Sequence, residues 1–192
     1  MKTWMKSIAI VVICLHLNAC VAVIAGAAVG GALLVHDRRS VGTIIDDESI
    51  EFSGYNAVRK QHPGATHRFV IESHNGLVLL TGQTKDPKVK ESAFQILSRM
   101  DNVRRVYNFM DVGPLIHSKQ VTHDLWLGSK IKAQMALNLS VDPTRINIVV
   151  ENNVVYLMGI VSEQEAKKAT DVARYYPGVG RVVQLFELLA KP

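Results

Sequence analysis

The stretch from His123 to Lys132 holds the residues whose types and spacing could do chemistry at a surface. Trp126 and Lys130 are four residues apart, so on a helix they form a neighbouring pair. An indole ring beside an ammonium group suits the interface of a bilayer, where the ring lies among glycerol groups and the lysine reaches phosphate. Lys132 adds a second charge, which near an anionic surface contributes about 1 kcal/mol. The pattern predicts a helix face that contacts anionic lipid.

A second interpretation of the same stretch is an ordinary helix packed on a core. Leu127, Ile131 and Met135 recur with helical spacing and are the predicted core stripe. Trp126 is offset from that stripe by about 100°, yet tryptophans are usually well buried, so Trp126 could belong to the core. The lysines could form a solvated face, and Asp124 nearby reduces the local excess of positive charge. The spacing alone leaves both interpretations open.

No arrangement of residues predicts catalysis or a metal site. The histidines are scattered without ligand-like pairs, and no cysteine is near them to complete a site. The sequence has no glycine-rich phosphate loop and no nucleophile elbow. We interpret the cluster Asp46-Asp47-Glu48 as acidic residues that favour a helix N-terminus. We therefore predict a protein that is not an enzyme, with no metal, no cofactor and no small-molecule substrate. The histidines considered are His36, His62, His67, His74, His117 and His123.

The N-terminus has the pattern of a secretory signal peptide, predicted here as residues 1–19. Lys2 and Lys6 form its positive region, and an apolar run from Ile8 to Leu15 follows. The segment Leu17–Cys20 resembles the lipobox, at which lipoprotein signal peptidase cuts before a lipid-modified cysteine. We expect lipid attachment at Cys20 and a tether over residues 20–42. Because Val21 rather than aspartate follows the cysteine, we expect the outer membrane as the destination.

An uncleaved membrane anchor is the alternative for this region, since residues 21–35 are also apolar. His16 and Asn18 interrupt the stretch, and polar groups at mid-depth of a bilayer are costly, whereas a cleaved signal peptide discards both. Cysteine usage agrees with cleavage. The only cysteines are Cys14 and Cys20, so the mature chain could form no internal disulfide.

The distribution of charge argues against a nucleic-acid partner. The formal net charge of +5 includes Lys2 and Lys6, which the predicted cleavage removes. Residues 40–112 and residues 121–190 each contain equal numbers of acidic and basic side chains. A nucleic-acid-binding domain would concentrate lysine and arginine on its folded part. We therefore expect no nucleic-acid partner.

An internal repeat defines the organisation of the remaining chain. Residues 75–82 align with residues 152–159 at an offset of 77, and residues 103–106 align with residues 179–182 at an offset of 76. The repeat predicts two modules, residues 43–112 and residues 121–190. Between them lies a linker, residues 113–120, which opens on Gly113-Pro114.

Each module is predicted to have the order α-β-β-α-β. Two apolar runs meet at Asn75-Gly76 and at Asn152-Asn153, which are residues that tight hairpins favour. We expect a fold of the α/β class, α+β type, with a three-stranded mixed sheet packed on two helices in each module. Modules of about seventy residues are near the lower limit for an independent core, so packing between the copies should add stability. The predicted helices are 46–61, 87–100, 123–139 and 163–175, with Asp86 and Ser162 as caps, and the last strands are 103–112 and 181–189.

Several features together resemble the dual BON-domain outer-membrane lipoproteins, over nearly the whole chain. They are the lipobox at Cys20, the stretch from Asp37 to Thr43 leading to Asp46-Asp47, and a hairpin followed by a glycine in both copies. The strongest match is residues 155–161, with Glu163, Glu165 and Ala166 close behind. The resemblance implies two BON modules on a lipid-anchored protein of the outer membrane that faces the periplasm.

The resemblance also implies a function. It implies binding of anionic phospholipid, above all phosphatidylglycerol, through the first helix of the second module, where the family's lipid-binding tryptophan falls on Trp126. The position that corresponds to Trp126 in the first module is Ser49, so the fold itself does not require an aromatic residue there. The predicted phospholipid-binding residues are Leu125, Trp126, Gly128, Ser129, Lys130 and Lys132.

Further expectations from the resemblance concern the role in the cell. It implies support of outer-membrane integrity, concentration at the division site and contact with the outer-membrane barrel-assembly machinery. The alternative is a periplasmic interaction scaffold. Its exposed strand edges or helices would contact envelope assembly machinery, and its lipid binding would be incidental.

Overall fold

The computed structural model describes residues 37–64, 66–137 and 141–190. The predicted signal peptide, the uncleaved-anchor alternative, Cys20 and most of the predicted tether lie outside these residues. Arg38–Pro192 belong to one compact unit. Within the described ranges, no helix has both the length and the apolar character needed to cross a membrane.

The predicted element order α-β-β-α-β is confirmed in both modules. The first module contains α3 (Val41–Gln61), β1 (His67–His74), β2 (Leu77–Thr84), α4 (Pro87–Ser98) and β3 (Arg105–Val112). The second contains α5 (Ser118–Leu137), a short 3-10 helix η2 (Pro143–Arg145), β4 (Asn147–Glu151), β5 (Val154–Val161), α6 (Glu163–Arg174) and β6 (Arg181–Leu188).

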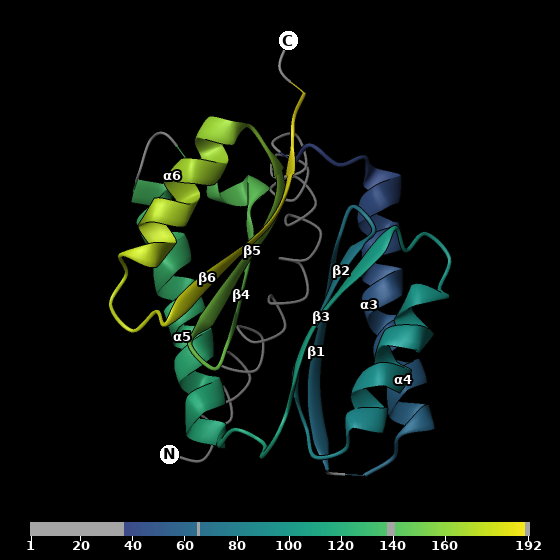
Figure 1. Ribbon diagram of the computed structural model, residues 1–192. Coiled ribbons are helices and arrows are strands. Elements are labelled where there is room, and N and C mark those ends of the chain that lie inside the picture. Colours follow the sequence, from purple (N-terminus) through teal and green to yellow (C-terminus); the bar gives the residue numbers. More distant parts are fainter. Residues whose placement is uncertain (1–36, 65, 138–140, 191–192) are drawn as a thin grey trace, which may run out of the picture. The chain divides into compact units, whose positions relative to one another are not determined.

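Each module forms one three-stranded mixed sheet, as predicted. The orders are β1-β2-β3 and β4-β5-β6, and the central strand is antiparallel to the first and parallel to the last. A parallel pair needs a long crossover, which α4 and α6 provide. In Figure 1, α3 and α4 cover one face of the first sheet, and α5 and α6 cover one face of the second.

The two predicted hairpins are confirmed by their backbone angles. Asn75 and Gly76 have φ of 55° and 70°, and Asn152 and Asn153 have φ of 50° and 62°. The structure also explains why a glycine, Gly82 or Gly159, follows each hairpin. Both have positive φ, and a Cβ atom at Gly159 would lie 2.3 Å from the carbonyl oxygen of Arg145. Glycine therefore recurs because the neighbouring backbone leaves no room for a side chain.

The second helix of each module begins as predicted, whereas the first begins earlier. Asp86 accepts a hydrogen bond from the Lys88 amide, and Ser162 forms a capping box with Glu165. The first helices begin at Val41 and Ser118, five residues before the predicted starts. The apolar pattern misses these turns because their outer residues, such as exposed Val41 and Ile45, do not follow the core stripe.

The interpretation of Asp46-Asp47-Glu48 as N-terminal acids was wrong. The cap of α3 is Ser40, whose hydroxyl accepts from the Thr43 amide at 3.0 Å, and the first turn contains no acid. Asp47 instead lies well inside the helix and is buried.

Three apolar clusters stabilise the compact unit, one beneath the helices of each module and one between the sheets. The cluster between the sheets contains the Phe109 and Tyr156 rings, whose centroids are 5.2 Å apart. β2 and β5 are therefore buried on both faces, which explains the continuous apolar runs in the first half of β2 and along β5. The expected packing between the copies is confirmed. The cluster consists of Leu79, Val149, Tyr156, Met158 and Leu185, with Val70, Leu77, Tyr107, Phe109, Val154 and Val183 packed against it.

Candidate functional site

Helix α5 has one buried face, and this face is the predicted stripe. Leu127, Ile131 and Met135 are fully buried and belong to the core of the second module. The prediction that these three residues form the core side of the helix is confirmed. They fix which way the remaining side chains of α5 point.

Trp126 lies on the surface of α5 and not in the core. Its side chain is 51% exposed, and Leu125 beside it is also exposed. The Lys130 Nζ atom lies 5.9 Å from the centroid of the Trp126 ring, and the His123 ring lies 5.8 Å from it on the preceding turn. The indole is thus held between two groups that can carry positive charge, with an exposed face.

The acid in this helix does not offset its lysines as the sequence suggested. Asp124 is only 2% exposed, and its carboxylate accepts hydrogen bonds from the backbone amides of Asn152 and Asn153 at 2.7 and 3.1 Å. It is the only acidic residue of α5. Lys130 and Lys132 are exposed, so the solvent-facing surface of α5 carries basic side chains and no acidic one.

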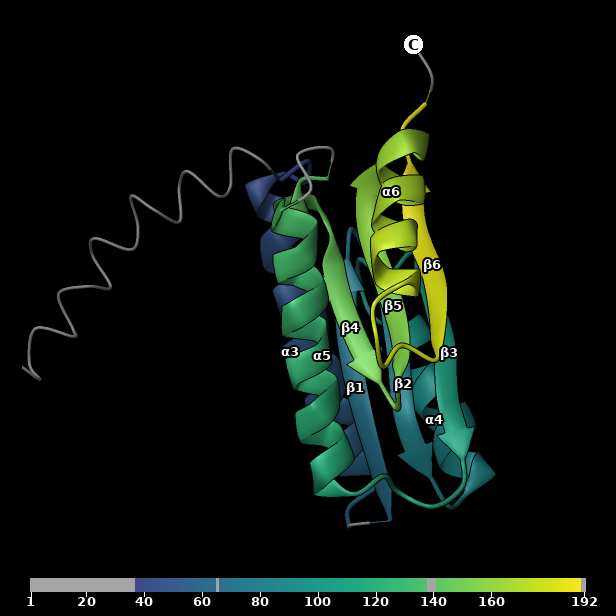
Figure 2. The ribbon, with the colours of Figure 1, turned by 90° about the vertical axis from the view of Figure 1, so that its left-hand side faces the viewer.

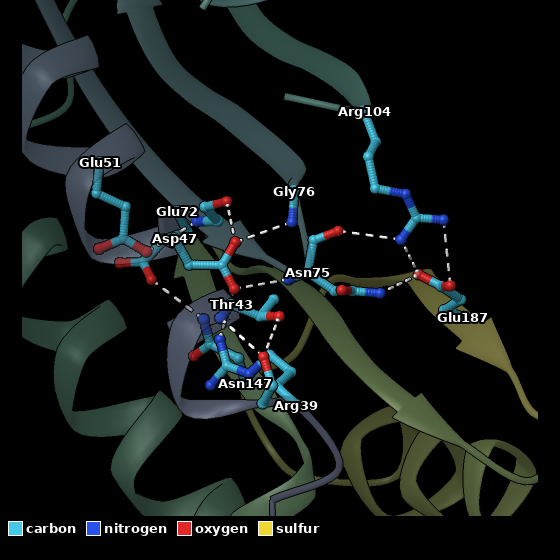
Figure 3. Close-up of polar contacts among 12 residues, drawn as sticks. Arg39, Thr43, Asp47, Glu51, Glu72, Asn75, Gly76, Arg104, Asn147 and Glu187 are labelled. Carbon is cyan, nitrogen blue, oxygen red and sulfur yellow. Dashed lines mark hydrogen bonds and ion pairs between the residues drawn. The ribbon is translucent and has the colours of Figure 1, made fainter. Parts of the chain in front are cut away.

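The first module contains the same aspartate contact, which sequence reasoning missed. The Asp47 carboxylate accepts from the amides of Asn75 and Gly76 at 2.7 and 2.8 Å and from the Ser73 hydroxyl at 2.6 Å (Figure 3). Burial by itself would raise the pKa of Asp47, but these hydrogen bonds and one from Arg39 hold it below its usual value.

The signal that could have found this pair is its spacing. Asp47 and Asp124 are 77 residues apart, which is the offset of the two hairpins. Each aspartate ties the first helix of its module to the turn of the hairpin. The contact therefore positions α5 relative to β4.

Four of the six predicted phospholipid-binding residues line a groove between α5 and the edge strands β4 and β1. The groove has a volume of about 290 Å³ and includes Leu125, Gly128, Ser129 and Lys132 on the helix side. Figure 2 shows α5 running beside β4. Trp126 and Lys130 are not part of the lining, so the structure divides the predicted set into four groove residues and one surface pair. The other lining residues are Arg68, Val70, Glu72, Val121, Asp124, Ile148, Val149, Val150 and Glu151.

Ion pairs join the two modules, and the sequence did not predict them. Arg68 pairs with Glu151. Arg104 pairs with Glu187 at 2.8 Å, as Figure 3 shows. Arg38, within the stretch from Asp37 to Thr43, donates to Glu165 at 2.8 Å. Burial would raise the pKa of Glu165, but hydrogen bonds from Arg38, Ser162 and Arg145 lower it to about 2. These residues are structural partners that fix the positions of α6 and the sheets.

In the described part of the chain, no group of three or more histidine, cysteine or acidic residues could hold a metal ion. The histidines are scattered along the sequence, but two of them lie close together in the fold. The rings of His62 and His67 lie with centroids 6.3 Å apart. Burial, and after it the charge of His62, lowers the pKa of His67. Both belong to the first module, away from α5.

Comparison with known families agrees with this repeated architecture. The model of the BON domain matches residues 46–114 and again residues 123–190. The chain belongs to the BON-domain family. The two BON domains correspond to the two modules described above, including the helix, hairpin and crossover of each.

Two curated relatives are similar over most of this BON chain. The "Outer membrane lipoprotein DolP" of Haemophilus influenzae is 36% identical over 176 residues, which cover 91% of both chains. The "21 kDa hemolysin" of Actinobacillus pleuropneumoniae is 33% identical over 150 residues, covering 78% of this chain and 77% of that one. Among solved structures, CdsD of the type III secretion system of Chlamydia trachomatis is 15% identical with a TM-score of 0.31. It covers 76% of this chain and 92% of that chain, a likeness too low to support any argument.

The location predicted from the sequence is confirmed at this level. This BON protein is similar along nearly its whole length to an outer membrane lipoprotein, so it is a lipid-anchored protein of the outer membrane that faces the periplasm. Cys20 as the attachment residue stays a prediction.

Proposed function

We propose that this BON protein binds anionic phospholipid, above all phosphatidylglycerol, through α5, and thereby supports outer-membrane integrity at the division site. The observation that carries the proposal is the exposed indole of Trp126 beside Lys130, on a helix surface without an exposed acid. An aromatic ring next to basic side chains is the composition of helices that lie in the interface of a membrane.

The energetics favour a role in selecting lipid rather than in anchoring. A lipid anchor already holds the protein at the membrane, so α5 need contribute only the preference for one lipid composition. Lys130 and Lys132 would contribute about 1 kcal/mol each near an anionic surface. Together they would give about 2 kcal/mol, which is roughly thirtyfold in affinity between anionic and zwitterionic lipid.

The test uses protein lacking residues 1–20 and vesicles that contain either phosphatidylcholine alone or a mixture with phosphatidylglycerol. Removing residues 1–20 leaves the compact unit and its three apolar clusters whole. We expect Trp126→Glu to weaken the affinity for the anionic vesicles, measured by co-sedimentation, by tenfold or more. The melting temperature should be unchanged, because the ring lies outside the core.

Phe52→Glu is the matched control, because Phe52 is an exposed aromatic residue, 74% exposed, on the first helix of the other module. It should leave vesicle binding unchanged. Equal binding of wild type and Trp126→Glu, or an equal loss in both variants, would contradict the proposal.

A second candidate is an interaction scaffold for envelope assembly machinery, including the barrel-assembly machinery. Two observations favour it: β1 and β4 are edge strands, and Val41, Ile45 and Phe52 are exposed on α3. Cells that carry Trp126→Glu separate the candidates. If the envelope barrier and the localisation of the protein survive while lipid binding is lost, the scaffold is the correct function.

A further inference from the structure

The two modules differ at one position where helix and hairpin meet. Glu51 on α3 corresponds to Gly128 on α5, and Ser73 on β1 corresponds to Val150 on β4, both at the repeat offset of 77. In the first module the Glu51 Oε1 atom accepts a hydrogen bond from the Ser73 amide at 2.8 Å. The first module thus fills the space between its helix and its edge strand with its own carboxylate.

In the second module no helix side chain fills this position, because the residue is Gly128. A Cβ atom there would lie 3.3 Å from the Val150 Cγ2 atom, so the Val150 side chain would have to shift by a few tenths of an ångström. The groove of about 290 Å³ described above occupies this place. Its apolar wall is formed by Val121, Leu125, Ile148 and Val150.

The Val150 amide points toward the free edge of β4. Val150 pairs with Val155 just as Ser73 pairs with Val78, two positions before a two-residue turn. The Ser73 amide donates to Glu51, so these pairs are the non-hydrogen-bonded kind, whose amides point away from the partner strand. No strand pairs with the other edge of β4, and within the described residues no acceptor for the Val150 amide is found. The second module therefore has a backbone amide without an acceptor among the described residues, at Val150, where the amide of the first module, at Ser73, is bonded to Glu51.

A basic side chain lies at the same groove, and each of the three acids in the lining accepts at least one hydrogen bond. Glu72 accepts from the Asn147 side chain at 3.1 Å. Glu151 accepts from Arg68 and from Gln83 through Oε1, while its Oε2 atom is buried without a partner among the described residues. Asp124 is occupied by its hairpin amides. Lys132 forms no ion pair with any described residue, and the corresponding position in the first module is Tyr55. The groove therefore combines the Val150 amide, which has no acceptor, with apolar walls and with the Lys132 ammonium group, which forms no ion pair with a described residue.

We propose that this groove captures a single anionic phospholipid molecule, with a headgroup or ester oxygen on the Val150 amide in the place that Glu51 fills in the first module. The negative charge lies toward Lys132, and the first part of one acyl chain lies against Leu125 and Ile148. The groove, at about 290 Å³, is just below the range of about 300–1,000 Å³ for small-molecule sites, so the rest of the lipid stays in the bilayer. This inference rests on the proposed function and deepens it, because α5 then binds an individual lipid besides lying on the membrane.

The experiment separates capture of one molecule from association with a bilayer. Dihexanoyl phosphatidylglycerol is titrated below its critical micelle concentration into protein lacking residues 1–20, and backbone amide shifts are followed by NMR. We expect a saturable shift at Val150 and Gly128. Dihexanoyl phosphatidylcholine should bind several-fold more weakly, because Lys132 has no net charge to neutralise.

The variant Gly128→Gln with Val150→Ser copies the first module, because the glutamine carbonyl can accept from the strand amide without adding charge. It should weaken monomer binding by at least tenfold, with the fold checked by circular dichroism and thermal melting. Ala133→Gln, an exposed change on α5 outside the groove, is the matched control and should bind as wild type. Lys132→Gln, a surface change that does not touch the core, should abolish the preference for phosphatidylglycerol.

The outcomes distinguish this proposal from the function on which it rests. The proposal that the groove captures a lipid is overturned if no saturable shift appears at Val150. It is also overturned if the Gly128→Gln/Val150→Ser variant binds the lipid as tightly as wild type. If Trp126 still directs binding to anionic vesicles in that case, only the proposal of lipid capture in the groove is wrong. If vesicle binding is also absent, the proposed function is wrong as well. A shift produced by a blocked Ala-Val-Ala-Val-Ala peptide and not by lipid would make the groove a strand-addition site and would equally overturn the proposal.

Discussion

Asp47 and Asp124 are buried carboxylates that hold the first helix of each module against its own hairpin. Each accepts hydrogen bonds from two successive turn amides. Such amides would otherwise be left without partners next to a buried helix, which is costly. At the scale of single residues, the orientation of α3 and α5 therefore depends on one carboxylate each.

The contact at Asp47 predicts a large effect on stability. Asp47→Ala should lower the free energy of unfolding by about 3 kcal/mol, because it leaves the amides of Asn75 and Gly76 unsatisfied. Urea unfolding followed by circular dichroism measures this. Asp46→Ala, an exposed neighbour, is the control and should change stability by less than about 0.5 kcal/mol. Equal effects of the two changes would show that the buried contact is unimportant.

Glu51 predicts a dependence of stability on pH. Its pKa is raised from 4.5 to about 7, chiefly by burial and further by the charges of Glu72, Glu48 and Asp47, against the hydrogen bond from Ser73, which lowers it. Because the folded pKa is the higher one, the folded state binds the proton more tightly, and stability is lost as the pH rises from 4.5 through 7.

Glu51→Gln removes this titration and keeps an oxygen for the Ser73 amide. The variant should be more stable than wild type at pH 8 by about 1 kcal/mol, a value reduced for solvent screening, and equally stable at pH 4. Urea unfolding at the two pH values provides the comparison, with Glu91→Gln on exposed α4 as the control. If the free energies of unfolding of the variant and the wild type differ by the same amount at both pH values, the raised pKa of Glu51 is refuted.

At the scale of elements, the sequence predicted the parts that local chemistry determines. The hairpins followed from Asn75-Gly76 and Asn152-Asn153, and two helix starts followed from Asp86 and Ser162, because these signals act within a few residues. The start of α3 was missed because Ser40 precedes turns whose exposed apolar side chains break the amphipathic pattern. The groove was missed because Gly128, Val150 and Val70 meet only in the folded chain.

The glycine after each hairpin predicts an element-level effect. Gly159→Ala should destabilise the protein by about 3 kcal/mol, because it combines a positive φ with a clash on the Arg145 carbonyl. Gly113→Ala is the control, since a Cβ atom there would meet nothing within 4 Å. Thermal melting of both variants tests the difference, and a Gly159→Ala protein as stable as wild type would be incompatible with the observed strand geometry.

At the scale of the whole molecule, the two modules pack together within one compact unit that begins at Arg38. The apolar cluster between the sheets draws on both modules, and Arg68 to Glu151 and Arg104 to Glu187 are ion pairs between them. The repeat in the sequence predicted two modules but could not show which faces meet. That depends on strand faces, and the first half of β2 and all of β5 have apolar side chains on both faces.

Shared packing predicts shared unfolding. Phe109→Ala should lower stability by about 2 kcal/mol through lost contact with Tyr156 and neighbouring side chains, while both modules still unfold together. Amide hydrogen exchange, read separately for β2 and β5, provides the measurement. Tyr175→Ala, an exposed aromatic change in the second module, should have little effect. Two well-separated transitions in the wild type would contradict a single unit.

The proposed function depends on the indole of α5 entering anionic lipid. Protein lacking residues 1–20 retains one of the two tryptophans, Trp126, so its fluorescence reports on this ring alone. With phosphatidylglycerol-containing vesicles the account predicts emission at shorter wavelength and protection from an aqueous quencher, and with phosphatidylcholine vesicles little of either. An emission spectrum that is identical in both lipids and in buffer would contradict it.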